Sequence, residues 1–113
     1  MIQKYDNPKF DLGRIVITPT ADKTIDEILS NCEVVLDKQE FIGMQILQRH
    51  VRGDWGEGMY EEDKELNDEA INFEGNEDKQ QRVHSCYKFD NITLWVITEW
   101  DRSVTTILLP SDY

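Results

Sequence analysis

The chain has 113 residues, of which 23 are acidic and 12 are Lys or Arg, for a formal net charge of −11. This length supports one hydrophobic core rather than two, and the 39% hydrophobic content exceeds that of disordered chains. Such a negative charge disfavours direct contact with nucleic acid or an anionic membrane. No secretory signal and no apolar run of about 20 residues is present, so we expect a cytoplasmic protein.

The start of the chain predicts an arm and a strand. Residues 1–12 have no clear period and should form a surface arm held by Tyr5 and Phe10. The β-branched run at residues 14–18 is stopped by Pro19, which predicts a short buried strand followed by a turn.

Two amphipathic helices are predicted next. The first has Thr24 or Asp22 as its N-cap, and the second runs over residues 38–49 behind an Asp37 and Glu40 capping box. The apolar stripe of the first helix consists of Ile25, Ile28, Leu29 and Cys32, and that of the second consists of Phe41, Met44, Leu47 and Val51.

The middle of the chain contains most of the negative charge. Residues 54–79 hold eleven acidic residues against two lysines, which accounts for −9 of the total −11. Three glycines at the start of this window enclose Trp55 and predict a rigid loop with an anchored indole. Residues 61–73 should form a surface helix, whose thin apolar stripe consists of Leu66, Ala70 and Phe73.

The last third predicts three strands at residues 83–89, 92–100 and 104–109, separated by short polar turns. The predicted fold class is therefore α+β. A single domain at residues 13–113 should contain one N-terminal strand, two to three helices and a C-terminal three-stranded antiparallel meander. Its expected core contains Ile15, Ile17, Ile28, Leu29, Phe41, Leu66, Val96, Ile97 and Leu108.

The acidic helix suggests a binding surface. Glu61, Glu65 and Asp68 share one face, at a spacing that resembles a phosphate backbone in charge and scale. A solvated, solubilising face is the alternative, and divalent-cation binding lacks support because no calcium-loop motif occurs. The predicted partner-binding residues are Asp54, Trp55, Glu57, Met59, Tyr60, Glu61, Glu62, Glu65, Asp68 and Glu69.

A second candidate site lies on the strand at residues 83–89, where period two places several basic residues on one face. A nucleic-acid enzyme could use Arg82, His84, Lys88 and Arg102, with His84 able to transfer protons near neutral pH. The alternative is that charged residues protect an edge strand from aggregation.

No cofactor or metal is predicted. The candidate ligands Cys32, His50, His84 and Cys86 lack the spacing of a zinc site, and no hydrolase motif or phosphate-binding loop occurs. The two cysteines are expected to be buried free thiols rather than a disulfide.

Three strings of residues resemble a family of small bacterial proteins carried on plasmids, phages and other mobile elements. They are the string at residues 13–19, Arg49-His50 with the string at 53–56, and the strings at 95–99 and 101–110. The resemblance covers most of the chain after residue 12. It implies a bacterial or phage-infected cell, where such proteins often act against host defence, and it brings no known catalytic residues.

The order of elements is also similar to that of small ribosome-dependent RNase toxins of the RelE and ParE kind, by topology alone. We hypothesise a non-enzymatic inhibitor that blocks a basic, nucleic-acid-binding surface of a host protein, in the manner of an anti-restriction or anti-CRISPR protein. The alternatives are a toxin-like RNase and a structural or oligomerising module. A homodimer is left open, and no direct contact with nucleic acid or membrane is expected.

Overall fold

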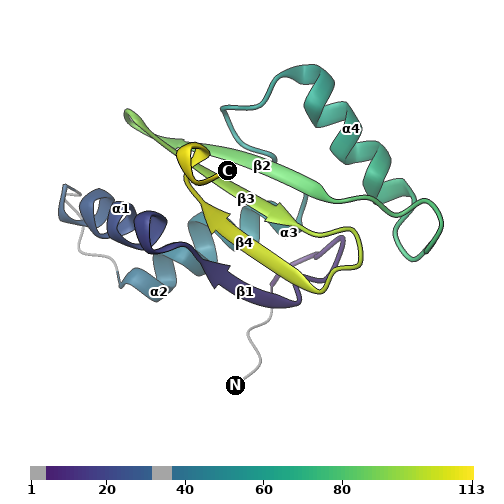
Figure 1. Ribbon diagram of the computed structural model, residues 1–113, viewed down its shortest axis with the longest axis horizontal. Coiled ribbons are helices and arrows are strands. Elements are labelled where there is room, and N and C mark those ends of the chain that lie inside the picture. The colour runs from purple at the N-terminus through teal and green to yellow at the C-terminus, as the bar shows by residue number, and fades with distance from the viewer. Residues whose placement is uncertain (1–4, 32–36) are drawn as a thin grey trace.

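The computed structural model describes residues 5–31 and 37–113. Its elements form one mixed four-stranded sheet with helices along and beside it, in the strand order β1-β4-β3-β2 (Figure 1). The elements are β1 (Arg14–Ile17), α1 (Pro19–Ser30), α2 (Lys38–Phe41), the π-helical segment η1 (Ile42–Leu47), α3 (Gln48–Val51), α4 (Glu61–Asn72), β2 (Val83–Phe89), β3 (Ile92–Thr98), β4 (Val104–Leu108) and the short helix η2 (Pro110–Asp112).

The α+β class is confirmed, but the predicted strand arrangement is incomplete. Strand β3 lies between β2 and β4 and is antiparallel to both. Strand β1 joins the sheet parallel to β4, with Ile15 opposite Thr105, so the sheet is mixed. Strand β1 can pair with β4 in parallel because the long connection after β1 carries the chain to the opposite edge of the sheet, where β2 lies.

Helix α1 begins earlier than the sequence predicted. Thr18 is the N-cap, its hydroxyl accepts a hydrogen bond from the Ala21 amide, and Pro19 occupies the first turn. The prediction of Thr24 or Asp22 as N-cap was therefore wrong, because Pro19 both ends the strand and starts the helix. The predicted stripe residue Cys32 lies outside the described residues.

The second predicted helix is present as the consecutive segments α2, η1 and α3. Asp37 caps it, accepting a hydrogen bond from the Gln39 amide at 2.8 Å. Met44, which the sequence placed on the apolar stripe, is 64% exposed. The π-helical register of η1 changes which side chains face inward, so a strict helical spacing misplaced this residue.

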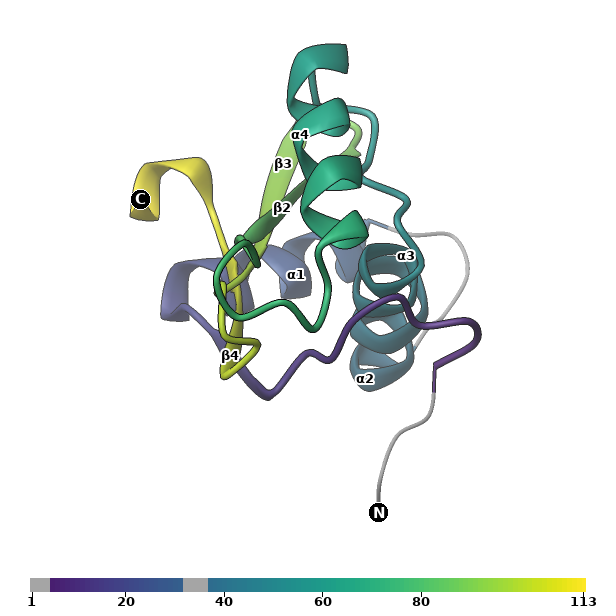
Figure 2. The same ribbon diagram turned by 90° about the vertical axis from the view of Figure 1, so that its right-hand side faces the viewer.

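The main core lies between one face of the sheet and helices α1 to α3, and Figure 2 shows α2 and α3 on one side of the strands. Two predicted core residues lie elsewhere, because Ile15 is 39% and Leu66 is 59% exposed. Ile97 and Leu108 are buried, but they lie on the opposite sheet face by strand alternation. The central cluster contains Ala21, Ile25, Ile28, Phe41, Ile46, Leu47, Tyr87, Leu94, Val96 and Ile107.

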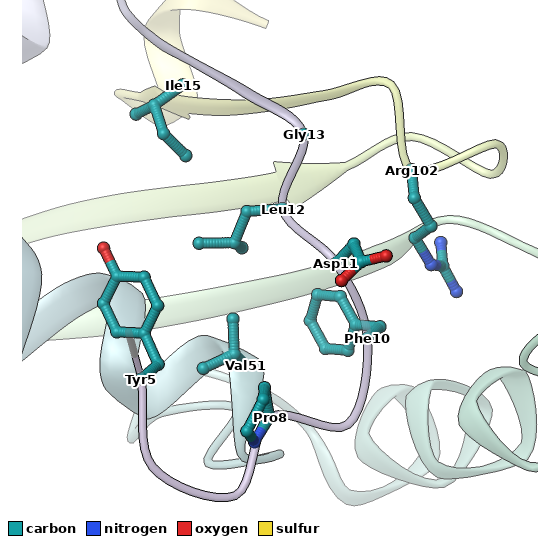
Figure 3. Close-up of a pocket in the computed structure, with 9 residues that line it drawn as sticks. All are labelled: Tyr5, Pro8, Phe10, Asp11, Leu12, Gly13, Ile15, Val51 and Arg102. Carbon is teal, nitrogen blue, oxygen red and sulfur yellow. The ribbon is translucent and has the colours of Figure 1, made fainter. Parts of the chain in front are cut away.

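The described part of the N-terminal arm belongs to a second cluster of buried residues. Phe10 is 5% exposed and packs in a stacked arrangement with Trp55, at a centroid distance of 6.3 Å. The guanidinium of Arg102 lies over the Phe10 ring at 5.3 Å. Figure 3 shows Phe10 and Leu12 beside a cavity of about 820 Å³ that also borders Tyr5. The arm is therefore held by Phe10, as predicted.

A chain of buried hydrogen bonds crosses the core at His50, which is completely buried. Its Nδ1 lies 2.6 Å from the Ser85 hydroxyl and its Nε2 lies 2.9 Å from the Thr98 hydroxyl. The Thr98 hydroxyl lies 2.7 Å from the Thr105 hydroxyl, which donates to the Leu12 carbonyl at 2.6 Å.

Each hydroxyl has one proton, and this fixes the direction of the chain. Because Thr105 donates to Leu12, it must accept from Thr98, and Thr98 must then accept from the His50 Nε2–H. Burial lowers the pKa of His50 to about 3, so its imidazole is neutral. With the single ring proton on Nε2, Nδ1 accepts from Ser85.

Within the described residues, no helix combines the length and apolar character that crossing a membrane requires.

We expect the free energy of unfolding to fall as the pH falls from 6.5 towards 5. The unfolded chain protonates His50 near its ordinary pKa of about 6.5, whereas the folded chain keeps it neutral down to about 3. One such proton changes the free energy of unfolding by about 1.4 kcal/mol per pH unit. Denaturant unfolding across this range should show a shallower dependence for His50→Gln than for the parent. His84→Gln is the control that keeps the His50 contribution, and equal slopes for parent and His50→Gln would contradict the assignment.

Candidate functional site

The acidic window divides into carboxylates that arginines neutralise and carboxylates that remain exposed. Arg49 on α3 binds Asp54 at 2.8 Å and Glu57 at 2.7 Å. Arg102 in the β3–β4 turn is 8% exposed and binds Glu74 at 2.8 Å. Three of the eleven acidic groups are therefore paired with arginines of the chain.

These pairs alter the ionisation of the loop. Burial acts to raise the pKa of Asp54, but the hydrogen bonds and charge of Arg49 outweigh it and lower the pKa. The pKa of Glu57 is lowered against burial too, by backbone hydrogen bonds and by Arg49. The Arg49 guanidinium also lies 4.3 Å from the centre of the Tyr87 ring. Asp54 and Glu57, which the sequence assigned to partner binding, thus hold the loop on α3 and β2.

Trp55 fixes the same loop from inside. It is 4% exposed, packs near His50 and Phe10, and donates its indole N–H to Asp68 at 2.9 Å. Trp55 is anchored, as predicted, and because its ring lies in the core we do not retain it among the partner contacts that we propose. Asp68 is the polar partner that a buried indole requires, so it also leaves the predicted row of carboxylates.

The outward face of α4 carries the exposed carboxylates. Asn67 and Ala70 face inward and are buried. The helical period then directs four glutamates away from the protein, and among the described residues the only ion pair they make is a 3.6 Å contact between Glu61 and Lys64. These residues, which we call the acidic face, are Glu61, Glu62, Glu65 and Glu69.

Helix α4 is attached to the outer edge of β2 by the Asn67 side chain, which bonds to the strand backbone. The Asn67 side chain donates to the His84 carbonyl at 2.7 Å and accepts from the His84 amide at 3.1 Å. Next along the strand, the Cys86 amide donates to the Trp55 carbonyl at 2.9 Å, and the Gly58 amide donates to the Cys86 carbonyl at 3.0 Å.

The Glu57 carboxylate completes this edge by accepting from the Lys88 amide at 3.2 Å. Every second residue of β2 is therefore paired on its outer side, which protects an edge strand from adding another chain. Gly56 and Gly58 permit this close approach, because a Cβ at either position would collide with Cys86. Gly56 also has a φ of +94°, which side chains rarely adopt.

A groove of about 450 Å³ lies between α4 and the outer face of the sheet. Its floor includes His84, Cys86 and Trp95, and its walls include Tyr60 and Leu66, which are 77% and 59% exposed. We call it the α4 groove. The remaining lining residues are Gly58, Met59, Asp63, Asn67, Gln81 and Arg82.

The C-terminal residues lie near this groove. Tyr113 packs on Trp95 at a centroid distance of 5.6 Å and accepts a hydrogen bond from Arg82 at 2.8 Å. Asp112 accepts hydrogen bonds from the hydroxyls of Thr18 and Thr20 at the start of α1. These contacts hold the C-terminal residues in place, so that Tyr113 borders the α4 groove at Trp95.

His84 has a chemically distinctive position in the groove. Its ring packs edge-on against Trp95 at 4.6 Å, and Nε2 is buried with no hydrogen-bond partner within the described part of the chain. Burial and the charge of Arg82 lower the pKa of His84, although Asp63 acts in the opposite direction. The ring is therefore neutral at pH 7 and presents one unsatisfied nitrogen.

The residues of the enzyme alternative do not form one site. Arg82 and His84 share the α4 groove, but Lys88 is exposed and does not line it. Arg102 is buried, with its guanidinium bound to Glu74 and to the carbonyls of Gln81 and Glu99.

The metal candidates are also dispersed. His50 belongs to the buried hydroxyl chain, whereas His84 and Cys86 line the groove, and Cys32 lies outside the described residues. Cys86 is a buried free thiol, as expected. Among residues 5–31 and 37–113, no three His, Cys, Asp or Glu side chains are grouped to hold a metal ion.

Sequence reasoning missed Arg49 and Asn67, which position the surface. Arg49 was noted only within a family-like string, and Asn67 appeared to be one polar residue in an acidic helix. A signal for Asn67 was present, since it lies one turn before the buried Ala70 and interrupts the run of charges.

Comparisons of the chain with protein-family models, with curated proteins and with solved structures find no match. The resemblance to mobile-element proteins therefore stays a prediction.

We expect Asn67→Ala to loosen α4 from β2. The substitution removes both side-chain bonds to the His84 backbone and leaves edge groups unpaired, which should lower the free energy of unfolding by about 1–3 kcal/mol. Amide exchange at His84 should become faster. Glu69→Ala, on the outward face of the same helix, is the matched control and should change stability by less than about 0.5 kcal/mol. Unchanged protection of the His84 amide in Asn67→Ala would show that Asn67 does not dock the helix.

Proposed function

We propose that this protein is a non-enzymatic binding protein whose acidic face occupies a basic, normally nucleic-acid-binding surface of another protein. The observation that carries the proposal is the division within the acidic window. Asp54, Glu57 and Glu74 are neutralised by buried or half-buried arginines, whereas the glutamates of the acidic face point away from the protein.

The energetics of α4 support a role beyond folding. Like charges at a spacing of four residues, as between Glu61 and Glu65 and between Glu65 and Glu69, destabilise a helix by a few tenths of a kcal/mol per pair. Within the described residues, the Lys64 contact is the sole ion pair that offsets this repulsion. A surface that costs stability and remains unpaired is suited to meet positive charge from outside.

Apolar groups lie beside this charge, as a tight interface requires. Tyr60 and Leu66 replace Trp55 as the anchors we propose, because both are exposed and both border the α4 groove. The unsatisfied Nε2 of His84 lies in the same groove and could pair with a polar group of the partner. The carboxylates would raise the association rate, and the groove would slow dissociation.

The mechanism is competitive exclusion, in which the protein covers phosphate-binding residues of its target. The resemblance to proteins of mobile elements favours a host target such as a defence nuclease. The acidic charge disfavours direct contact of this chain with nucleic acid.

The first test removes charge from the acidic face. Glu61→Gln, Glu65→Gln and Glu69→Gln combined keep side-chain size, leave Asp68 to bind Trp55, and should hold or slightly raise the free energy of unfolding. Association with a partner captured from bacterial lysate should slow several-fold and become less dependent on salt, because steering is screened over about 8–10 Å.

The matched control removes the same number of charges elsewhere. Asp11, Glu27 and Glu40 are exposed, and among the described residues their side chains make no ion pair. Converting these three to amides should leave the association rate near that of the parent. If the two triple variants associate with the partner at the same rate, the location of the removed charges does not matter, and the acidic face is only a solvated surface.

A second test separates anchoring from steering. Tyr60→Ala and Leu66→Ala remove exposed side chains, so stability should change by less than about 0.5 kcal/mol. Dissociation should become about tenfold faster with little change in association rate or salt dependence. Surface plasmon resonance with the captured partner provides both rates, and unchanged dissociation would exclude the groove rim from the interface.

A further inference from the structure

The two edges of the sheet differ in how their backbone groups are satisfied. The Arg14 amide donates to the Ser103 carbonyl, just before β4, and the Thr18 amide donates to the Ile107 carbonyl of β4, at 3.0 Å each. Alternate residues of β1 therefore face β4. The backbone N–H and C=O groups of Ile15 and Ile17 therefore point away from the sheet. Within the described residues, these groups have no hydrogen-bond partner.

This openness contrasts with the opposite edge. Loop and helix groups cover β2 at His84, Cys86 and Lys88, whereas no comparable segment of the described chain pairs with β1. Edge strands that are left open usually carry lysine, proline or a bulge to prevent addition of another chain. Strand β1 has Ile15, Val16 and Ile17 instead, and Ile15 and Val16 are 39% and 36% exposed.

We propose that β1 pairs with β1 of a second copy of this chain, in antiparallel orientation, to join two four-stranded sheets into one. The pairing is centred on Val16, through which the two-fold axis passes. This contact is isologous, so both copies use the same surface and the assembly closes as a dimer.

The open groups of β1 match this register. With Val16 at the centre, Ile15 lies opposite Ile17 of the second copy, and each such pair exchanges two backbone hydrogen bonds. Both residues present outward N–H and C=O groups, so the two pairs together satisfy all of them. The two copies of Val16 form a non-hydrogen-bonded pair, in which side chains approach most closely. Arg14 faces Thr18 of the second copy rather than another arginine.

The distribution of charge favours pairing of a second copy at the β1 edge rather than at the β2 edge. The window from Asp54 to Lys79 carries −9, and α4, its main helix, lies beside β2 at the far side of the sheet (Figure 1). Residues outside that window sum to only −2, with Arg14 on β1 itself. Pairing through β1 therefore keeps the two acidic faces at opposite ends of the joined sheet and leaves both accessible.

The surface next to β1 offers further apolar contact. Ile15 lines the cavity of about 820 Å³ together with Tyr5, Leu12 and Val51 (Figure 3). In the proposed register, Ile17 of the second copy lies opposite Ile15 on the same sheet face as this cavity. The pairing would thus bury side chains as well as satisfy backbone groups. Because the strand is short, we expect a weak, concentration-dependent dimer with a dissociation constant on the order of micromolar.

Sedimentation equilibrium of the intact protein tests the dimer directly. The dimer fraction should rise with concentration and also with salt, because salt screens repulsion between two chains that each carry −11. Binding through the acidic face to a basic partner should weaken with salt, so the two proposals fail independently. A monomer at all concentrations up to about 1 mM, at low and high salt, would overturn the pairing.

Cross-linking tests the register. Cα atoms in a non-hydrogen-bonded pair are about 4.5 Å apart, which suits a disulfide, so Val16→Cys should form a disulfide-linked dimer under mild oxidation. The matched control is Thr106→Cys, on the same face of the neighbouring strand, where the spacing of strands puts the two copies more than about 7 Å apart. The parent gives the background from native cysteines. Cross-linking of Thr106→Cys equal to that of Val16→Cys would overturn the register.

Charge at the two-fold axis provides the last variant. Val16→Lys places two ammonium groups together and should raise the dissociation constant at least tenfold, whereas Val16→Thr keeps the β-branched shape and should remain near the parent. Equal thermal unfolding of the two variants as dilute monomers shows that the fold is intact. Should Val16→Lys not fold, Ile15→Pro replaces it, because it removes an outward N–H that β4 does not use. A dimer unaffected by both changes would exclude this edge.

Discussion

The backbone groups along the outer edge of β2 require partners, and this requirement organises the surface of the protein. The segment from Trp55 to Gly58 pairs with Cys86, and Asn67 pairs with His84, so a loop and a helix together take the place of a fifth strand. This pairing of backbone groups also determines where the side chains of α4 point. Asn67 sets the rotation of α4, which in turn directs its glutamates outward and leaves a groove between the helix and the sheet.

Electrostatics divide this surface into two parts. Arg49 forms an ion pair with Asp54, and Arg102 forms one with Glu74. Both arginines are shielded enough from water for these ion pairs to stabilise the fold. The same window therefore supplies carboxylates that hold the loop and an exposed acidic face on α4. Net charge alone does not distinguish these uses, because it counts Asp54 and Glu65 equally.

The two sheet edges show the same physical problem with different solutions. An unpaired row of N–H and C=O groups invites another strand, so proteins cover it, charge it or use it. The loop at residues 55–58 and helix α4 cover the edge of β2, and the helix also carries the acidic face. No segment in the described part of the chain covers β1, the strand contains no lysine, and Val16 lies at the centre of its open side. Separation of the two edges would let one sheet support the proposed partner surface and the proposed self-association surface without competition.

Local chemistry made several features predictable from the sequence. The strand before Pro19, the cap at Asp37, the anchored Trp55 and the α+β class all follow from spacing and residue type, which act over a few positions. The predicted burial of that strand was wrong, because β1 lies at an edge of the sheet and most of its residues are exposed. Features that depend on distant residues were decided only in the tertiary structure. Nothing near Glu74 in the chain reveals that Arg102 will bind it, and only the fold brings His50 between Ser85 and Thr98. Strand pairing, burial and ion pairing join residues far apart in sequence, and a one-dimensional pattern contains no record of those distances.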